Sequence, residues 1–337
     1  MLEKVQSALA EICQQYRDPR IHHCHLEAAS LRHGRCVLNG SVLDAATLSA
    51  VTTELQSHFP AVTMDAGTVE VLRQALPDLA TVCTNVTGLY ADPSFRAEMV
   101  SQVLNGWQVE VLQRQDRWSF VRLEDGYLGW VYQPYTSEAP APGVTDIICV
   151  PATLLHCRPA AKAELLGRVL GGTTVQVTGT EGAWVEIVLA GALAGWMPAI
   201  DVRPLGTLPE DEAGRRRQMM QDAHQFTGVP YLWGGGTALG LDCSGFVQLI
   251  YRLAGVPIPR DADMQFDARP PVEPPFQPGD LLYFGGNGGH RTISHVGMSR
   301  GGWQMIHASR SRNGVYVDDV EQSGWLHDNF QGARTFL

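Results

Sequence analysis

The chain has 337 residues, of which 45% are hydrophobic, enough to bury the cores of about two to four domains. A net charge of −10 argues against binding to nucleic acid or to anionic membrane surfaces. There is no secretory signal at the N-terminus and no apolar stretch of membrane-spanning length, and the seven cysteines suit a reducing compartment, so we expect a cytoplasmic protein.

Residues 1–75 predict a separate α+β domain. Helical periodicity covers residues 2–16 and 45–59, and the second of these helices begins after Asp44. The predicted strands are 21–28, 35–42 and 62–72. This α-β-β-α-β order weakly resembles the BON domain, known examples of which bind lipids or other ligands. The adjacent residues His22 to His25 would alternate between the faces of a strand, so we expect no metal site there.

The middle of the chain contains a duplication at an offset of 66 residues. The matched positions include Cys83 and Cys149, Pro93 and Pro159, Glu98 and Glu164, Trp118 and Trp184, and Trp130 and Trp196. Alternating apolar residues and glycine turns predict short antiparallel strands in both copies. The copies resemble bacterial SH3 domains, and we expect small β-barrels at 80–137 and 145–206, separated by a proline-containing linker at 137–143.

The two copies differ just before the closing tryptophan. Asp125-Gly126-Tyr127 in the first copy corresponds to Gly191-Ala192-Leu193 in the second. Tyr127 is therefore a candidate ligand contact that the second copy lacks. The alternative is that Tyr127 is one more aromatic residue of the barrel core.

The C-terminal region, residues 210–337, contains the candidate nucleophile Cys243. Apolar periodicity predicts a helix that begins at Cys243, and Asp242 before it is a suitable N-cap. The unpaired N–H groups and the positive end of the helix dipole favour a thiolate there. Gly234-Gly235-Gly236 upstream would allow the backbone to approach a ligand closely.

A cysteine nucleophile needs a base, and two predicted strands downstream supply histidines. His295 lies in the first and His307 in the second, with a turn signal at residues 299–302 between them. The resulting β-hairpin would bring the two rings together. We expect His295 to be the base and His307 to orient it.

The C-terminal region resembles the NlpC/P60 family of cysteine peptidases, which cut peptidoglycan stem peptides on a papain-like fold. The family's motifs appear in order as Tyr231-Leu232-Trp233-Gly234, Asp242-Cys243-Ser244-Gly245, Pro278-Gly279-Asp280-Leu281, His295-Val296-Gly297 and Ile306-His307-Ala308. The resemblance implies that Cys243, His295 and His307 are catalytic, and that Tyr231 joins the Cys243 N–H at the oxyanion site. It implies no metal and no cofactor. The expected fold is a multidomain α+β chain.

Two SH3-like domains before such a region, together with Arg260-Asp261, resemble the γ-D-glutamyl-L-diamino acid endopeptidases of murein peptide recycling. In those relatives the first SH3 domain closes the cleft, so that only peptides with a free N-terminal L-Ala fit. The substrate would be L-Ala-γ-D-Glu followed by diaminopimelate or lysine. The resemblance implies a substrate pocket made by Asp242, Ser244, Arg260, Asp261, Tyr127 and Glu98. For Arg260, a local ion pair is an equal alternative.

Three other functions stay open at this point. A secreted endopeptidase acting on intact peptidoglycan would use the SH3-like domains as wall anchors, although the missing signal argues against it. An amidase or acyltransferase would keep the Cys-His-His residues but lack the amine pocket. A catalytically inactive binding module conflicts with the complete triad.

Overall fold

The computed structural model describes residues 1–139, 143–286 and 292–337, so Pro140 to Pro142 of the predicted linker lie outside the described residues. The described chain divides into two compact units. The first unit comprises residues 1–79 and 109–130, and the second comprises residues 80–108 and 131–337. Among the described residues, no helix is both long and apolar enough to cross a membrane.

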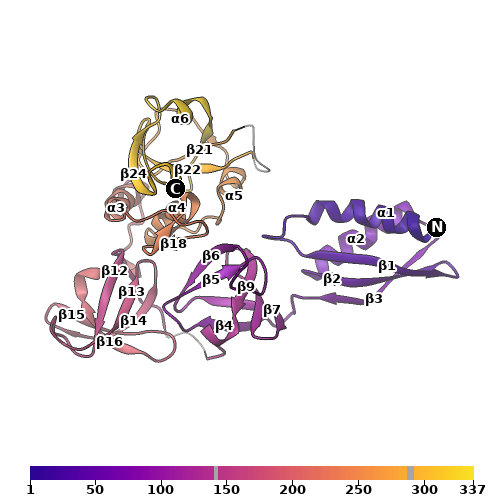
Figure 1. Cartoon of the computed structure of the whole chain (residues 1–337), viewed down its shortest axis with the longest axis horizontal. Coiled ribbons are helices and arrows are strands. Elements are labelled where there is room, and N and C mark those ends of the chain that lie inside the picture. The colour runs from indigo at the N-terminus through magenta and orange to yellow at the C-terminus, as the bar shows by residue number, and fades with distance from the viewer. Residues whose placement is uncertain (140–142, 287–291) are drawn as a thin grey trace. The chain divides into compact units, whose positions relative to one another are not determined.

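The N-terminal part of the first unit is a three-stranded sheet with two helices (Figure 1). Its elements are α1 (Leu2–Cys13), β1 (Cys24–Arg32), β2 (Arg35–Val42), α2 (Ala45–His58) and β3 (Thr63–Val71). The strand β2 lies in the centre, antiparallel to β1 and parallel to β3. Both helices share one core with the sheet, to which Leu9, Leu38 and Leu55 belong. The predicted α-β-β-α-β order is confirmed, while the BON resemblance stays a prediction.

The N-cap expected before α2 is present. The Asp44 carboxylate accepts a hydrogen bond from the Thr47 N–H at 2.8 Å, which satisfies one of the N–H groups that a helix start leaves unpaired.

The duplication holds strand for strand at the offset of 66 residues. The matched strands are β5 (Val86–Tyr90) and β12 (Ala152–His156), β6 (Met99–Leu104) and β13 (Leu165–Leu170), β7 (Gln108–Gln115) and β14 (Thr174–Glu181), β8 (Trp118–Arg122) and β15 (Trp184–Val188), and β9 (Leu128–Tyr132) and β16 (Ala194–Pro198). Even a β-bulge recurs, at Leu89/Tyr90 and at Leu155/His156. We call residues 78–137 the first repeat and residues 146–204 the second repeat.

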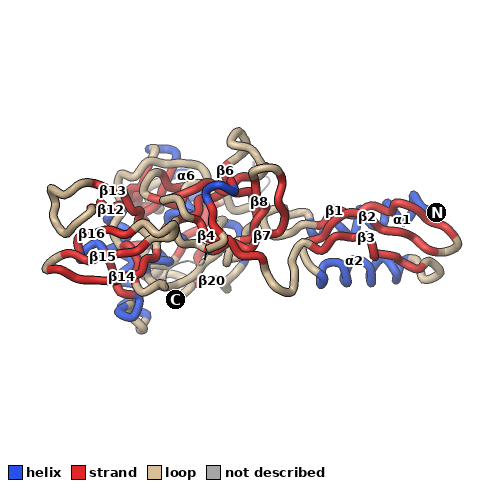
Figure 2. Tube along the Cα trace, turned by 90° about the horizontal axis from the view of Figure 1, so that it is seen from below, coloured by secondary structure: helices blue, strands red, loops and turns tan. Residues whose placement is uncertain are grey.

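Short strands complete both repeats: β4 (Asp78–Val82) and β10 (Thr136–Ser137) in the first, β11 (Asp146–Ile148) and β17 (Val202–Pro204) in the second. In the first repeat, the β5–β6 hairpin belongs to the second unit and the β7–β8 hairpin to the first. The second repeat lies wholly in the second unit, with the strand order β13-β12-β16-β15-β14-β11-β17. Figure 2 labels five of these strands, β12 to β16. The core of the second repeat includes Leu155, Val169 and Ile187.

The C-terminal region packs helices against a six-stranded sheet whose order is β20-β25-β21-β22-β23-β24. The strands are β20 (Pro271–Val272), β21 (Leu281–Phe284), β22 (His295–Gly301), β23 (Gln304–Ser309), β24 (Gly314–Asp319) and β25 (Phe330–Arg334). The helices are α3 (Glu212–Gln225), α4 (Cys243–Leu253), α5 (Ala262–Asp267) and α6 (Gly324–Asp328). A small ribbon of β18 (Gly236–Thr237) and β19 (Gly240–Leu241) leads into α4.

The helix α4 lies at the centre of this region. Phe246, Val247 and Ile250 are fully buried and share one core with Val296 and Ile306 of the sheet. This packing fixes the position of Cys243, the first residue of α4, against the strand that begins with His295.

Candidate active site

Asp242 caps the helix that begins with Cys243, as the sequence predicts. One carboxylate oxygen of Asp242 accepts a hydrogen bond from the Gly245 N–H at 2.7 Å, and the other accepts one from the Gly234 N–H at 2.9 Å. The same side chain therefore fixes both the start of α4 and the glycine loop before it. Cys243 is held in the first helical turn by these contacts.

The glycines of the motif permit close packing of backbones. Gly234 has a φ of +73°, and a Cβ there would lie 2.1 Å from the Met99 carbonyl oxygen of β6. A Cβ on Gly245 would lie 2.1 Å from the Gly235 carbonyl oxygen. Any side chain at either position would force the loop away. At Gly234 the close approach is therefore to the first repeat, whereas a Cβ on Gly236 would meet nothing within 4 Å, so the expected approach to a ligand stays a prediction there.

His295 and His307 meet across the predicted hairpin of β22 and β23. The Nε2 atom of His295 lies 2.7 Å from the Nδ1 atom of His307. The register pairs Met298 with Ile306, which places His307 across from Gly297. A Cβ on Gly297 would lie 3.0 Å from the His307 Cβ, so this glycine gives the two rings the space to approach each other.

Asp318 extends this pair, although no motif in the sequence pointed to it. Its carboxylate on β24 lies 3.3 Å from His307 Nε2, within ion-pair distance but without hydrogen-bond geometry. A carboxylate on that side favours the proton on His307 Nε2. His307 Nδ1 then accepts from His295 Nε2–H, which leaves the lone pair of His295 Nδ1 for the thiol proton. This tautomer is the one that a general base requires.

The charges of the site are set by burial. Burial lowers the pKa of His295 to about 3, with a contribution from His307, and lowers the pKa of His307 to about 4. Burial also raises the pKa of the Cys243 thiol to about 12, and the Asp242 carboxylate adds to this effect. Burial therefore favours the neutral forms of the thiol and of both imidazoles.

Burial thus opposes the thiolate that the position of Cys243 at a helix start favours. The N–H groups of Ser244 and Val296 and the Arg260 guanidinium favour the charged sulfur, while removal of that sulfur from water disfavours it.

Tyr231 lies beside the start of α4. It forms an isolated parallel bridge with Leu241, and the next residue donates its N–H to the Leu241 carbonyl at 3.1 Å. Burial raises the pKa of Tyr231, and the neighbouring Cys243 adds to the shift. The phenol therefore keeps its proton and is able to donate a hydrogen bond, as an oxyanion site requires.

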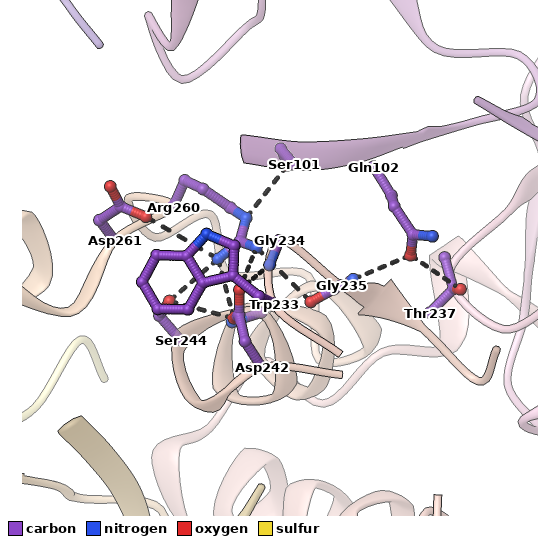
Figure 3. Close-up of polar contacts among 12 residues, drawn as sticks. Ser101, Gln102, Trp233, Gly234, Gly235, Thr237, Asp242, Ser244, Arg260 and Asp261 are labelled. Atoms are coloured by element: carbon purple, nitrogen blue, oxygen red, sulfur yellow. Dashed lines mark hydrogen bonds and ion pairs between the residues drawn. The ribbon is translucent and has the colours of Figure 1, made fainter. Parts of the chain in front are cut away.

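Arg260 is buried and connects the start of α4 to the strand β6 of the first repeat (Figure 3). It therefore exposes no surface to a substrate. Its side chain is 1% exposed. The guanidinium donates to both carboxylate oxygens of Asp242, at 3.0 and 2.7 Å, and to Ser244 Oγ at 2.9 Å. Its Nε donates to Ser101 Oγ of β6 at 3.0 Å. The substrate contact expected for Arg260 is corrected to the local ion pair, because a guanidinium this deeply buried is already committed to protein acceptors.

The first repeat supplies further contacts to the glycine loop through residues next to Ser101. Gln102 Oε1 accepts hydrogen bonds from the Gly236 N–H and from Thr237 Oγ1, both at 3.0 Å (Figure 3). Glu98 Oε1 accepts a hydrogen bond from Trp233 Nε1 at 2.6 Å. Glu98 is therefore brought to the loop that leads to Cys243.

The remaining predicted pocket residues are placed as follows. Asp242 and Ser244 are buried in the Arg260 cluster. Asp261 is the N-cap residue before α5, and its carboxylate lies 3.9 Å from Arg260 Nη1. Tyr127 is buried in the first unit. Within the described ranges, no three His, Cys, Asp or Glu side chains are arranged to hold a metal ion.

Comparisons with known proteins agree with this site. Residues 228–334 match the model of the NlpC/P60 family, and residues 89–133 match that of the bacterial dipeptidyl-peptidase Sh3 domain. A γ-D-glutamyl-L-lysine dipeptidyl-peptidase of Bacillus subtilis is 30% identical over 231 residues, which cover 64% of this chain and 74% of that protein. A protein of the same name from Bacillus cereus is 27% identical over 259 residues, covering 71% and 76%.

A crystal structure of an NlpC/P60 family protein from Bacillus cereus shares the fold. Its TM-score is 0.67 at 22% identity, and the match covers 77% of this chain and 99% of that chain. A helix that presents a buried cysteine to a histidine pair on a neighbouring sheet defines a cysteine hydrolase. The chain belongs to the NlpC/P60 family, which is a family of cysteine peptidases.

Proposed function

We propose that this chain hydrolyses the bond between γ-D-glutamate and an L-diamino acid in peptidoglycan stem peptides that carry a free N-terminal L-Ala. The peptides would be released fragments that are recycled in the cytoplasm. Support comes from the names of the relatives and from one structural observation. That observation is the position of Glu98, which the first repeat brings to Trp233 at the glycine loop.

Each proposed step uses a group already described. Cys243 Sγ attacks the γ-carbonyl carbon while its proton passes to His295 Nδ1. The Cys243 N–H and the Tyr231 hydroxyl stabilise the oxyanion that forms. His295 then donates the proton to the departing amine of the diamino acid. Water hydrolyses the resulting thioester and releases L-Ala-D-Glu.

Selection for a free amine follows from electrostatics. An ammonium group that leaves water needs carboxylates and hydrogen-bond acceptors around it. Glu98 and Asp261 are the carboxylates we assign to this role. The Asp242 carboxylate, in contrast, already forms a buried ion pair with Arg260 at 2.7 Å, so we assign it to the structure of the pocket.

The test compares L-Ala-γ-D-Glu-diaminopimelate with its N-acetylated form. Acetylation removes the charge, and we expect kcat/KM to fall by about 30- to 1000-fold, corresponding to about 2–4 kcal/mol. Glu98→Gln should impair the free peptide and reduce the difference between the two substrates. Glu164→Gln is the matched control, because Glu164 occupies the same position in the second repeat.

Two outcomes would count against the proposal. Equal rates on the two peptides would mean that no carboxylate binds the amine. Faster release of fragments from intact sacculi than from free peptides would favour a wall-acting endopeptidase that uses its SH3-like repeats as anchors.

A further inference from the structure

Two cysteines of the first unit, Cys13 and Cys24, lie in contact and have no part in the proposed peptidase reaction. Their sulfur atoms are 3.3 Å apart. Cys13 is the last residue of α1, and Cys24 is the first residue of β1. Both are reduced, and both are partly exposed. A small reagent therefore has access to a pair of thiols that are already aligned.

The setting of this pair differs from that of the other cysteines. Cys36 lies in the same domain but is fully buried in its core, and Cys243 is buried at the active site. Cys157 is exposed. Cys13 and Cys24 combine access with a neighbouring sulfur, the two conditions that make an oxidised thiol condense to a disulfide.

We propose that Cys13 and Cys24 form a reversible disulfide when the protein meets a small-molecule disulfide such as oxidised glutathione. The Cys13 thiolate attacks one sulfur of the oxidant and displaces one glutathione thiolate. The Cys24 thiolate then attacks the Cys13 sulfur and displaces the second. The two protein thiols lose two protons and two electrons, and the oxidant is reduced to two thiols.

The 3.3 Å contact lets one thiol attack the oxidant while the other resolves the mixed disulfide. Either thiol can donate the hydrogen bond between them. We take Cys13 as the attacking sulfur and Cys24 as the resolving one, and the serine variants test this order.

The geometry requires little movement. A disulfide needs a sulfur separation of about 2.05 Å, so the sulfurs must approach by a little over 1 Å, which rotation of the side chains supplies. Both side chains already pack against the core shared by α1 and the sheet. The bond would tie the end of α1 to the start of β1 across the intervening loop, and we expect it to raise the thermal midpoint of the first unit.

The experiment uses the full chain incubated with oxidised glutathione, followed by intact mass measurement and non-reducing peptide mapping. We expect a loss of about 2 Da, a cross-linked pair of peptides containing Cys13 and Cys24, and reversal by dithiothreitol. Cys24→Ser should trap Cys13 as its glutathione mixed disulfide. Cys13→Ser should give slower modification, and Cys157→Ser is the control with an unchanged cross-link.

Peptidase activity, assayed after excess oxidant is removed, separates this pair from the active site. Wild type and Cys13→Ser should hydrolyse peptide at equal rates, because neither cysteine belongs to the catalytic machinery. The proposal is overturned if the wild-type protein keeps both thiols open to alkylation after oxidation, or if the cross-link joins other cysteines. Either result stands independently of the peptidase assignment.

Discussion

In the first repeat, Ser101 bonds Arg260 and Gln102 bonds the loop before α4, and the Arg252 guanidinium near the end of α4 lies 3.7 Å from the centre of the Trp107 ring. The second repeat contacts the C-terminal half of the helix. Arg203 of β17 donates to the Leu253 carbonyl at 3.0 Å and forms an ion pair at 2.8 Å with Asp222 of α3. Gly172 of the second repeat lies against the Leu249 side chain. Both repeats thus contact the C-terminal half of α4, and the first repeat also bonds the loop and the buried arginine beside its N-terminal end.

The matched strands β6 and β13 differ in the side chains that could bond the catalytic region. Ser101 and Gln102 of β6 correspond to Gly167 and Arg168 of β13, which lack the hydroxyl and amide that bond the catalytic region. Leu165 of β13 is 48% exposed. The strand pattern recurs in the second repeat, whereas these polar side chains do not. The hydrogen bonds to the loop before α4 and to Arg260 therefore depend on Ser101 and Gln102.

The largest effect on activity should come from the N-terminal end of α4, where Cys243 lies. Cys243→Ala removes the covalent nucleophile, and we expect kcat/KM to fall by at least about 1000-fold. The thermal midpoint should change little, because the lost sulfur leaves a small void. Peptide hydrolysis and thermal unfolding measure the two effects, and Cys157→Ala is the exposed control. Residual activity above a few per cent would refute Cys243 as the nucleophile.

A large loss of folding stability is expected from the ion pair beside the C-terminal end of α4. Asp222 is fully buried, and Arg203→Met would leave its carboxylate without the guanidinium. Breaking such a buried pair should lower the free energy of unfolding by about 3–5 kcal/mol, measured by denaturant titration. The folded fraction should keep its kcat/KM. A large drop in the kcat/KM of the folded protein would show that the second repeat also positions the N-terminal end of α4.

The buried histidines make the folding stability of the protein depend on pH. Burial lowers the pKa of His307 from 6.5 to about 4, so the unfolded chain binds more protons between these values. His307 therefore contributes stability in full above pH 6.5, and this contribution is lost as the pH falls toward 4. The loss should reach about 3 kcal/mol, or 1.36 kcal/mol for each pKa unit. Denaturant titrations across this range should show a shallower dependence in His307→Asn, and identical slopes would contradict the assignment.

Local motifs made much of the site predictable. Asp242, Cys243 and the His295–His307 hairpin are encoded by a cap residue, helical periodicity and a turn signal, all within short stretches of sequence. The roles of Arg260 and Asp318 depend on contacts with β6 and β23, and no local pattern specifies which distant strand will supply them. The helix position that favours a thiolate at Cys243 is readable from the sequence, whereas the burial that opposes it is not.

The smallest expected effect on kcat/KM is also the most direct test of the difference between the two repeats. Gln102→Ala removes the acceptor of the Gly236 N–H and the Thr237 hydroxyl, which loosens the loop that leads into Cys243. Losing hydrogen bonds of this kind corresponds to about 1–2 kcal/mol, so kcat/KM should fall by about 5- to 30-fold. Alkylation of Cys243 by a small electrophile should continue, because the thiol remains in place. Arg168→Ala changes the matched position of the second repeat and should leave both rates unchanged. If the two variants behave alike, the first repeat does not position the loop, and the proposed asymmetry between the repeats is wrong.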